Sequence, residues 1–379
     1  MFVMFNKLLL FLIIGTSFLF LFPVKSFAQT PPSQELTKGQ VTQIISEGET
    51  FVEGGPSQPY QVVKITFLDG PSRGKEITIN YGKDTTIREN QKVTVGEKVV
   101  ILKAATPKGT VYQIVDQYRL DALLPLIIFF FVLILLLSRL KGLGSIIGLF
   151  VSLLVITQFI VPQILAGRDA LIISIVGSLF IMITTIYLAH GFSRKTHIAV
   201  AATFIALILT GILGYFFVDF VHLSGLGTDD TFSLQFGPTA NINFKGLLLG
   251  GIIIGALGVL DDITTGLSAT IEELKKANPN YNFSELVKSG LRVGSEHIAS
   301  LVNTLVLAYA GVALPLFLFL ILNPMKQPLW AILNSEMIVE EIVRTLAGSI
   351  GLILAVPITT IFAAWVVTRQ KDKNVSRKK

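Results

Sequence analysis

The stretch that decides the fold of this 379-residue chain runs from Gly246 to Thr270 and contains Gly255-Ala-Leu-Gly-Val-Leu-Asp-Asp-Ile-Thr-Thr265. It is apolar, rich in glycine and long enough for a helix to cross the roughly 30 Å hydrocarbon core of a bilayer. Asp261 and Asp262 lie side by side in it. Each charged side chain at the centre of such a helix costs about 2.5 to 3.5 kcal/mol, which the surrounding Leu, Ile and Val residues offset. The stretch therefore predicts a membrane span that carries a functional carboxylate pair.

Two interpretations of Asp261 and Asp262 are open at this point. In the first, the pair is desolvated, titrates as one coupled unit and carries protons. In the second, both side chains reach water at the cytoplasmic end of the helix and only solvate that end. The sequence favours the first interpretation, because ionisable residues inside membrane spans mark functional sites by default.

The composition excludes a soluble globular protein. Hydrophobic residues make up 51% of the chain, charged residues make up 15%, and long apolar runs recur from Ala122 onward. Cysteine is absent, which excludes disulfides, thiolate metal sites and cysteine nucleophiles. The sequence contains no phosphate loop and no His-Glu-x-x-His motif, and its spans show no nucleophile with a base at a recognisable spacing. We therefore expect no enzyme activity, no cofactor and no metal site.

Residues 1–28 have the pattern of a cleavable signal peptide. Lys7 precedes an apolar run from Leu8 to Phe22, Pro23 ends that run, and Ser26-Phe-Ala28 places small residues where a signal peptidase cleaves. An uncleaved signal anchor is the alternative, and it would export the following segment in the same way.

Residues 29–121 have the pattern of a small extracytoplasmic β domain. Alternating, β-branched runs are separated by turn clusters such as Asp69-Gly-Pro-Ser72. The expected strands are 39–46, 62–67, 76–79, 98–104 and 110–117, which suits a barrel of the oligonucleotide/oligosaccharide-binding (OB) type. Acidic and basic residues balance here, so we do not expect nucleic-acid binding. An envelope protein or a small-molecule substrate is the expected partner.

Seven spans are expected in residues 122–368, which gives an α-helical polytopic membrane protein with an exported all-β domain. They are 122–138, 143–163, 170–189, 198–221, 246–270, 297–322 and 338–367. Lys and Arg concentrate in alternate loops and in a basic tail, residues 369–379. By the positive-inside rule, we expect the β domain to lie outside the cell membrane and the tail to lie in the cytoplasm, against anionic lipid.

Small residues share one face of the fifth span with an aspartate. Gly251, Gly255, Gly258, Asp262 and Thr265 recur at steps of three and four residues. This spacing predicts that another helix packs closely on the face and holds the carboxylate against protein instead of lipid.

Polar residues on two other spans are further candidates for the site. Asn303 and Thr304 lie on one stripe of the sixth span and are the expected partners of the aspartates. A hydrogen bond that only holds two spans together, worth about 1 kcal/mol, explains Asn303 equally well. Glu296 and His297 open the same span, where His297 is either a proton relay or a plain interfacial residue. Arg344 on the last span is a candidate gate, or the partner of the acids just before it.

Several motifs resemble the YibE/F family of bacterial multipass proteins. They are Gly255-Ala-Leu-Gly-Val-Leu-Asp-Asp262, Ala269-Thr-Ile-Glu-Glu-Leu274, Asn278-Pro279, Ser289-Gly-Leu-Arg-Val-Gly294 and Asn303-Thr-Leu-Val-Leu-Ala-Tyr309. The resemblance covers the membrane part and the exported amino-terminal domain. It implies an integral membrane protein and little about mechanism.

A Gly-x-x-Asp-Asp segment on a span, followed by a cytoplasmic amphipathic stretch, is also similar to the fourth span of resistance-nodulation-division permeases and of SecD and SecF. This similarity implies that Asp261 and Asp262 relay protons. The chain departs from those families because only one six-span half is present, no porter domain is inserted, and Ile-Thr-Thr follows the acids.

The expected function is proton-gradient-coupled transport, or assistance to transport, with an unknown substrate. The alternative is a non-transporting scaffold whose exported domain recruits an envelope partner and whose Asp pair only fixes helix packing. A half-permease also suggests a homo-oligomer. Gly144-x-x-x-Gly148 offers a close-contact surface for one, although such motifs more often pack helices within one chain.

Overall fold

The computed structural model describes residues 34–51, 57–83, 86–106, 109–236, 242–322 and 326–376. The expected signal peptide, residues 1–28, lies outside these residues, as does the end of the expected basic tail. The described chain forms two compact units, one that ends at Leu133 and one that begins at Ile134. Each unit has its own hydrophobic core.

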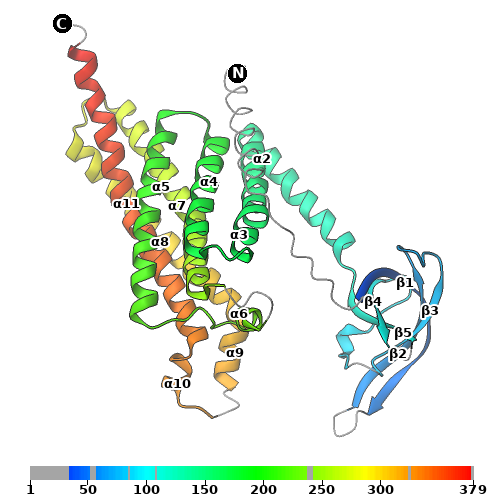
Figure 1. The fold of residues 1–379 in the computed structure, drawn as a ribbon. Helices are drawn as coiled ribbons and strands as arrows, with labels where there is room; N and C mark the ends of the chain where they lie inside the picture. The colour runs from blue at the N-terminus through cyan, green and yellow to red at the C-terminus, as the bar shows by residue number, and fades with distance from the viewer. Residues whose placement is uncertain are drawn as a thin grey trace. The chain divides into compact units, whose positions relative to one another are not determined.

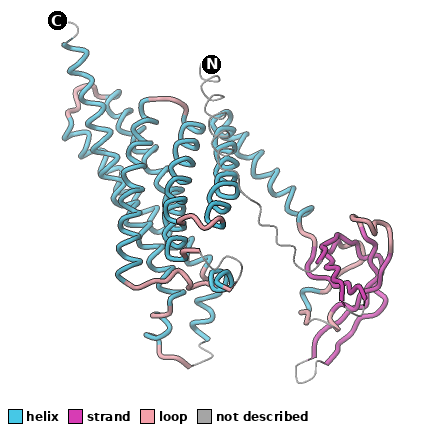
Figure 2. Tube along the Cα trace, in the orientation of Figure 1, coloured by secondary structure: helices cyan, strands magenta, loops and turns pink. Residues whose placement is uncertain are grey.

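The first unit contains one antiparallel sheet of five strands in the order β3-β2-β1-β4-β5, drawn in magenta in Figure 2. The strands are β1 (Gln34–Phe51), β2 (Ser57–Phe67), β3 (Glu76–Tyr81), β4 (Lys98–Thr106) and β5 (Gly109–Gln117). All five expected strands are present. β1 is longer than expected because its first part pairs with β4 and its second part pairs with β2. The sheet curls into a half-barrel with β3 and β5 as its edges, so a closed barrel of OB type remains a prediction.

Alternation of side chains places one face of this sheet in a dry core. Val63, Ile65 and Ile101 are 0% exposed, because successive residues of a strand point to opposite faces. A Cβ atom at Gly39 would lie 2.5 Å from side-chain atoms of both Ile65 and Ile101. Glycine at this position therefore lets β1 cross the core.

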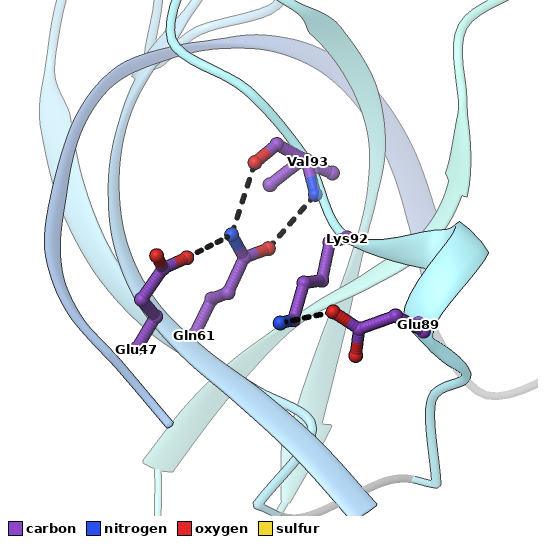
Figure 3. Close-up of polar contacts among 5 residues, drawn as sticks. All are labelled: Glu47, Gln61, Glu89, Lys92 and Val93. Atoms are coloured by element: carbon purple, nitrogen blue, oxygen red, sulfur yellow. Dashed lines mark hydrogen bonds and ion pairs between the residues drawn. The ribbon is translucent and has the colours of Figure 1, made fainter. Parts of the chain in front are cut away.

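A buried glutamine fastens the segment before β4 to the sheet (Figure 3). Gln61 on β2 is 2% exposed; its Nε2 donates to the carbonyl oxygen of Val93 at 3.1 Å, and its Oε1 accepts from the Val93 N–H at 2.8 Å. Nε2 also lies 3.2 Å from Oε2 of Glu47. The side-chain amide therefore satisfies both backbone groups of Val93, as a neighbouring strand would.

The second unit is helical (Figure 1). α2 (Leu120–Val155) crosses the boundary between the units and is interrupted at Arg139, where φ is 51°. A π-helix, η2 (Ile156–Ile160), and α3 (Val161–Leu165) continue it. The remaining helices are α4 (Ala170–His190), α5 (Arg194–Phe220), α6 (Asp229–Gln235), α7 (Phe244–Ala277), α8 (Phe283–Val312), α9 (Leu314–Leu322), α10 (Leu329–Leu333) and α11 (Glu336–Ser376).

Within the described residues, six helical stretches are long and apolar enough to cross a membrane, and a bent pair raises the number to seven. The six are Leu120–Arg139, Lys141–Leu165, Ala170–His190, Arg194–Phe220, Phe244–Ala277 and Glu336–Arg369. The pair is α8 and α9, which are bent by 66°. The bend precedes Pro315, which has no N–H to continue the helical ladder. The chain is therefore a multipass membrane protein.

α7 lies at the centre of the helical unit. It packs against α4, α5 and α11, and these helices run side by side in Figure 1. Leu260 and Leu267 on α7 and Leu352 on α11 are 0% exposed and belong to one core cluster. Burial of this stripe fixes the rotation of α7, and with it the directions of Asp261 and Asp262.

The Gly144-x-x-x-Gly148 motif packs within the chain. A Cβ atom at Gly144 would lie 2.2 Å from the carbonyl oxygen of Leu188 on α4, and one at Gly148 would lie 3.5 Å from Thr185. Small residues let two helix backbones approach this closely. The surface that the sequence offered for a homo-oligomer is thus occupied by α4.

Candidate functional site

Asp261 and Asp262 occupy successive positions of α7 but have different surroundings. Their side chains leave the helix about 100° apart around its axis. Asp261 is partly buried, and its Oδ1 atom is inaccessible and has no hydrogen-bond partner among the described residues. Asp262 is exposed and lines a cavity. The pair therefore combines one enclosed carboxylate oxygen with one open carboxylate.

The cavity beside Asp262 has a volume of about 230 Å³. Besides Asp262 it is lined by Lys141, His190 and Lys195, with Thr196, Ala199, Thr265, Gly266 and Ala269 completing the wall. Since a water molecule occupies about 30 Å³ in the liquid, the space accommodates several waters. Among the described residues, no group of three or more His, Asp or Glu side chains is arranged to hold a metal ion.

His190 is a site residue that the sequence analysis missed. It is the last residue of α4, directly before Gly191, whose φ is 70° and which ends the helix. The sequence analysis chose His297 as the candidate relay, but His297 is exposed on α8 and is not among the residues that line the Asp262 cavity. The sequence could have pointed to His190 through its position, because His190 ends one span and Lys195 lies at the start of the next, at the same end of the helices.

Threonine hydroxyls around the pair are already engaged by the backbone or by each other. Thr265 Oγ1 donates to the Asp261 carbonyl oxygen at 2.9 Å, and Thr264 Oγ1 lies 3.2 Å from the same oxygen. Thr264 Oγ1 also lies 2.6 Å from Thr203 Oγ1 on α5. These hydroxyls therefore bond to the Asp261 carbonyl oxygen or to each other, and none of them donates to the Oδ1 atom of Asp261.

The expectation that a helix packs on the glycine face of α7 is wrong. Within the described part of the chain, nothing would lie within 4 Å of a Cβ atom at Gly251, Gly258 or Gly266. A Cβ atom at Gly255 would meet only the hydroxyl of Tyr309, at 3.4 Å. Close packing of α7 instead uses the opposite face, where the large aliphatic residues lie. The glycine face is open.

The other expected partners on α8 do not meet the aspartates in this structure. Asn303 is exposed, and Thr304 Oγ1 donates to the Ser300 carbonyl oxygen of its own helix at 2.9 Å. Glu296, a candidate gate or interface residue, is also exposed. In the part of the chain that the structure describes, no hydrogen bond joins Asn303 or Thr304 to either carboxylate. A role for these residues in proton transfer therefore remains a prediction.

Arg344 lies on α11, towards the opposite end of the helical unit from Asp262. Its Nη1 atom pairs with Glu341 at 2.9 Å, which matches the ion pair that the sequence suggested. Glu340 has a different partner: it is 2% exposed and accepts a hydrogen bond from the N–H of Gly227 at 3.0 Å. Of the two acids just before Arg344, Glu341 therefore forms an ion pair with it, and Glu340 binds the loop at Gly227.

A second acid on α11 holds the same loop. Glu336 Oε1 accepts from the backbone N–H and the hydroxyl of Ser224, each at 2.6 Å, and from the N–H of Gly225 at 3.1 Å. Glu336 and Glu340 lie one helical turn apart. Together they fix the loop that follows α5 to the beginning of α11.

The helices that carry these features match a known family. The family model described as YibE/F-like protein matches residues 126–369. The chain belongs to the YibE/F-like family. The match includes both aspartates, His190 and Arg344, and it lies outside the five-stranded sheet. Comparisons with curated proteins and with solved structures found no match. The function of this YibE/F-like protein must therefore be argued from its site.

Proposed function

We propose that this YibE/F-like protein couples a proton gradient to transport across the membrane, with Asp261 and Asp262 as the proton carriers. The observation that carries the proposal is the divided environment of the pair. Asp262 shares a cavity with His190 and Lys195, whereas Asp261 has an enclosed oxygen with no donor. Intramembrane carboxylates that face protein or a water-filled cavity mark proton relays and ion pathways.

The two carboxylates would have different tasks. Asp262 exchanges protons with water in the cavity, where the imidazole of His190 can also accept or donate a proton. Asp261 carries the proton where water is excluded, because an ionised carboxylate without a partner is far more costly there than a neutral one. Protonation of Asp261 thereby changes the energy of packing α7 against its neighbours, which biases one conformation over another.

A second cavity on the same face of α7 supports a route across the membrane. Gly251 lines that cavity, and Asp262 lines the first one. At 1.5 Å per residue, the two positions are about 16 Å apart along the helix axis. Gly258 lies between them on the open face. A moving substrate would need a smooth, unobstructed helix surface of this kind.

We infer that the end of the helical unit with Lys141 and Lys195 faces the cytoplasm and that the sheet lies outside. The positive-inside rule supports this orientation, because basic residues concentrate in the loops and tail on that side. His190 would then meet protons on the cytoplasmic side.

Infrared spectroscopy of the protein in lipid tests the proton role. We expect pH-dependent carboxyl bands that disappear one at a time in Asp261→Asn and Asp262→Asn. On transfer to D₂O, the Asp262 band should exchange first, because Asp262 lines the open cavity. Asp219→Asn is the matched control, since Asp219 pairs with Lys245 at the other end at 2.6 Å. The proposal is overturned if both carboxylates are fully ionised from about pH 5 upward or if both variants retain every band.

A scaffold is the second candidate, and the sheet supports it. β3 and β5 are the edge strands of the sheet, and edge strands can pair with extended segments of other proteins. A cavity of about 270 Å³ beside them is lined by polar side chains that include Arg88, Gln117 and Arg119. Cross-linked envelope proteins captured equally by the wild type and by the double Asn variant, with no proton-dependent bands in the wild type, would favour this candidate.

A further inference from the structure

The second cavity, at the Arg344 end of the helical unit, has a volume of about 310 Å³ and two kinds of wall. One wall is aliphatic and includes Ile156, Ile160 and Ile254. The other is polar and includes Thr231, Glu340 and Arg344. A wall of each kind is typical of small-molecule sites, where apolar surface gives affinity and a few polar groups fix orientation.

Arg344 supplies the positive charge of the cavity wall. Its Nη1 atom pairs with Glu341 at 2.9 Å, and its Nε atom is inaccessible from the cavity. A guanidinium has five N–H donors, so one ion pair does not use all of them. Because a guanidinium matches a carboxylate in geometry as well as in charge, this wall suits a ligand with a carboxylate.

The polar wall also carries an acid, which disfavours a simple anion. Among the residues that line the cavity, the carboxylate of Glu340 stands beside the single guanidinium of Arg344, so the wall has one charge of each sign. Glu340 is held in place, because its carboxylate accepts from Gly227 and a Cβ atom at Gly227 would come within 2.7 Å of it. A ligand that carries an ammonium group beside its carboxylate balances both charges.

The π-helix η2 marks the same cavity independently. Ile156 and Ile160 begin and end η2, and both line the aliphatic wall. π-helical turns are rare and occur frequently at functional sites, because they re-aim side chains at a local cost in helix geometry. Here the re-aimed side chains form the apolar wall.

We propose that this cavity binds a small zwitterion with an aliphatic side chain, of the type of a branched-chain amino acid. Its carboxylate pairs with the guanidinium of Arg344, its ammonium group faces Glu340, and its side chain lies against Ile156 and Ile160. This inference rests on the proposed transport function, for which it names the substrate class.

Calorimetry on the full chain in lipid nanodiscs tests the inference with three probes that share one branched hydrocarbon side chain. The probes are L-leucine, 4-methylpentanoate, which lacks the amine, and 3-methylbutylamine, which lacks the carboxylate. We expect leucine to bind at least tenfold more tightly than either single-charge probe. Arg344→Lys keeps the charge but loses the planar guanidinium, and Glu340→Gln loses the acid; each should weaken leucine binding at least tenfold. Lys245→Gln, which changes a cation outside the cavity wall, is the control and should bind as the wild type does.

Equal binding of leucine and either single-charge probe, or no binding of leucine, overturns the inference. Ile156→Phe keeps the proposal testable if a polar-wall variant fails to fold, because it fills the aliphatic wall and should abolish binding. If the wild type shows the pH-dependent carboxyl bands but does not bind leucine, this inference alone is overturned. If the wild type binds leucine but shows no such bands, only the proton role is overturned.

Discussion

Thr203 on α5 and Thr264 on α7 share a hydrogen bond whose Oγ1 atoms lie 2.6 Å apart, and both side chains are 0% exposed. The bond joins two central helices three residues beyond Asp261. Hydrogen bonds between membrane helices contribute about 0.6 kcal/mol on average and at most about 1.7 kcal/mol.

We expect Thr203→Val to lower the free energy of unfolding in detergent by about 1 kcal/mol. A double-mutant cycle with Thr264→Val should give a coupling energy of similar size, because each variant removes the same bond. Thr304→Val, whose hydroxyl bonds only within its own helix, should couple to neither. A coupling energy near zero between positions 203 and 264 would show that the bond does not stabilise the native state.

Gly144 should tolerate no side chain. Gly144→Val puts a branched side chain where even a Cβ atom lies 2.2 Å from the Leu188 carbonyl oxygen, and overpacking of this kind costs about 1 to 3 kcal/mol or more. Thermal unfolding in detergent should show the loss. Gly251→Ala, at a position inside α7 with nothing within 4 Å, should not lower stability, because alanine is the better helix former. Equal melting temperatures for the two variants would refute the close contact between α2 and α4.

Gln61→Ala should destabilise the sheet more than its lost volume implies. The variant leaves the N–H and carbonyl of Val93 without partners, and each buried unpaired group costs about 1 to 3 kcal/mol. Limited proteolysis of the full chain should therefore cut the sheet faster. Gln43→Ala, an exposed residue on β1, is the control. Identical cleavage rates would mean that the segment before β4 is held by other contacts.

The pKa of Asp69 gives the sheet an acid-sensitive contact. The Thr37 hydroxyl, at 2.5 Å, and then the Lys38 N–H, at 2.7 Å, hold the pKa of this carboxyl below its ordinary value of 3.8. The associated stability is complete above pH 3.8 and is lost as pH falls through the lowered pKa. Urea unfolding should show a deficit for Asp69→Asn at pH 6 that shrinks at pH 2. Glu49→Gln, an exposed control on β1, should show no such trend, and a deficit for Asp69→Asn that is constant with pH would disprove the linkage.

Cysteine labelling tests the open face of α7, because the natural chain has no cysteine. Gly266→Cys lies on the wall of the Asp262 cavity with no neighbour within 4 Å, so a water-soluble thiol reagent should modify it rapidly. Ser268→Cys is the matched control, since Ser268 is 0% exposed and lies one half-turn further along the helix. Modification of both positions at equal rates would mean that α7 is accessible on all sides.

The sequence predicted those features that depend on hydrophobic pattern. The five strands and the long spans are present because alternation and apolar length are local properties. The strand pairing that opens the sheet at β3 and β5 depends on contacts between distant residues, which local pattern does not record.

For the site, the sequence found the aspartates but not their neighbours. Small residues on α7 suggested a packed face, yet the rotation of the helix was decided by Leu260 and Leu267 on the other side. With this rotation, Asp262 lines a cavity together with His190, and Asn303 is not part of that cavity. Which polar residue meets a carboxylate depends on how three helices are placed together, and periodicity on one helix cannot show it.

Asp261 and Asp262 are adjacent, and their side chains leave α7 about 100° apart. Because buried Leu260 and Leu267 fix the rotation of the helix, each carboxylate keeps its own surroundings: an enclosed oxygen for Asp261 and a cavity wall for Asp262. The boundary between dry and wet surroundings at α7 therefore runs between two successive residues, and a single peptide unit separates the two carboxylates that lie on either side of it.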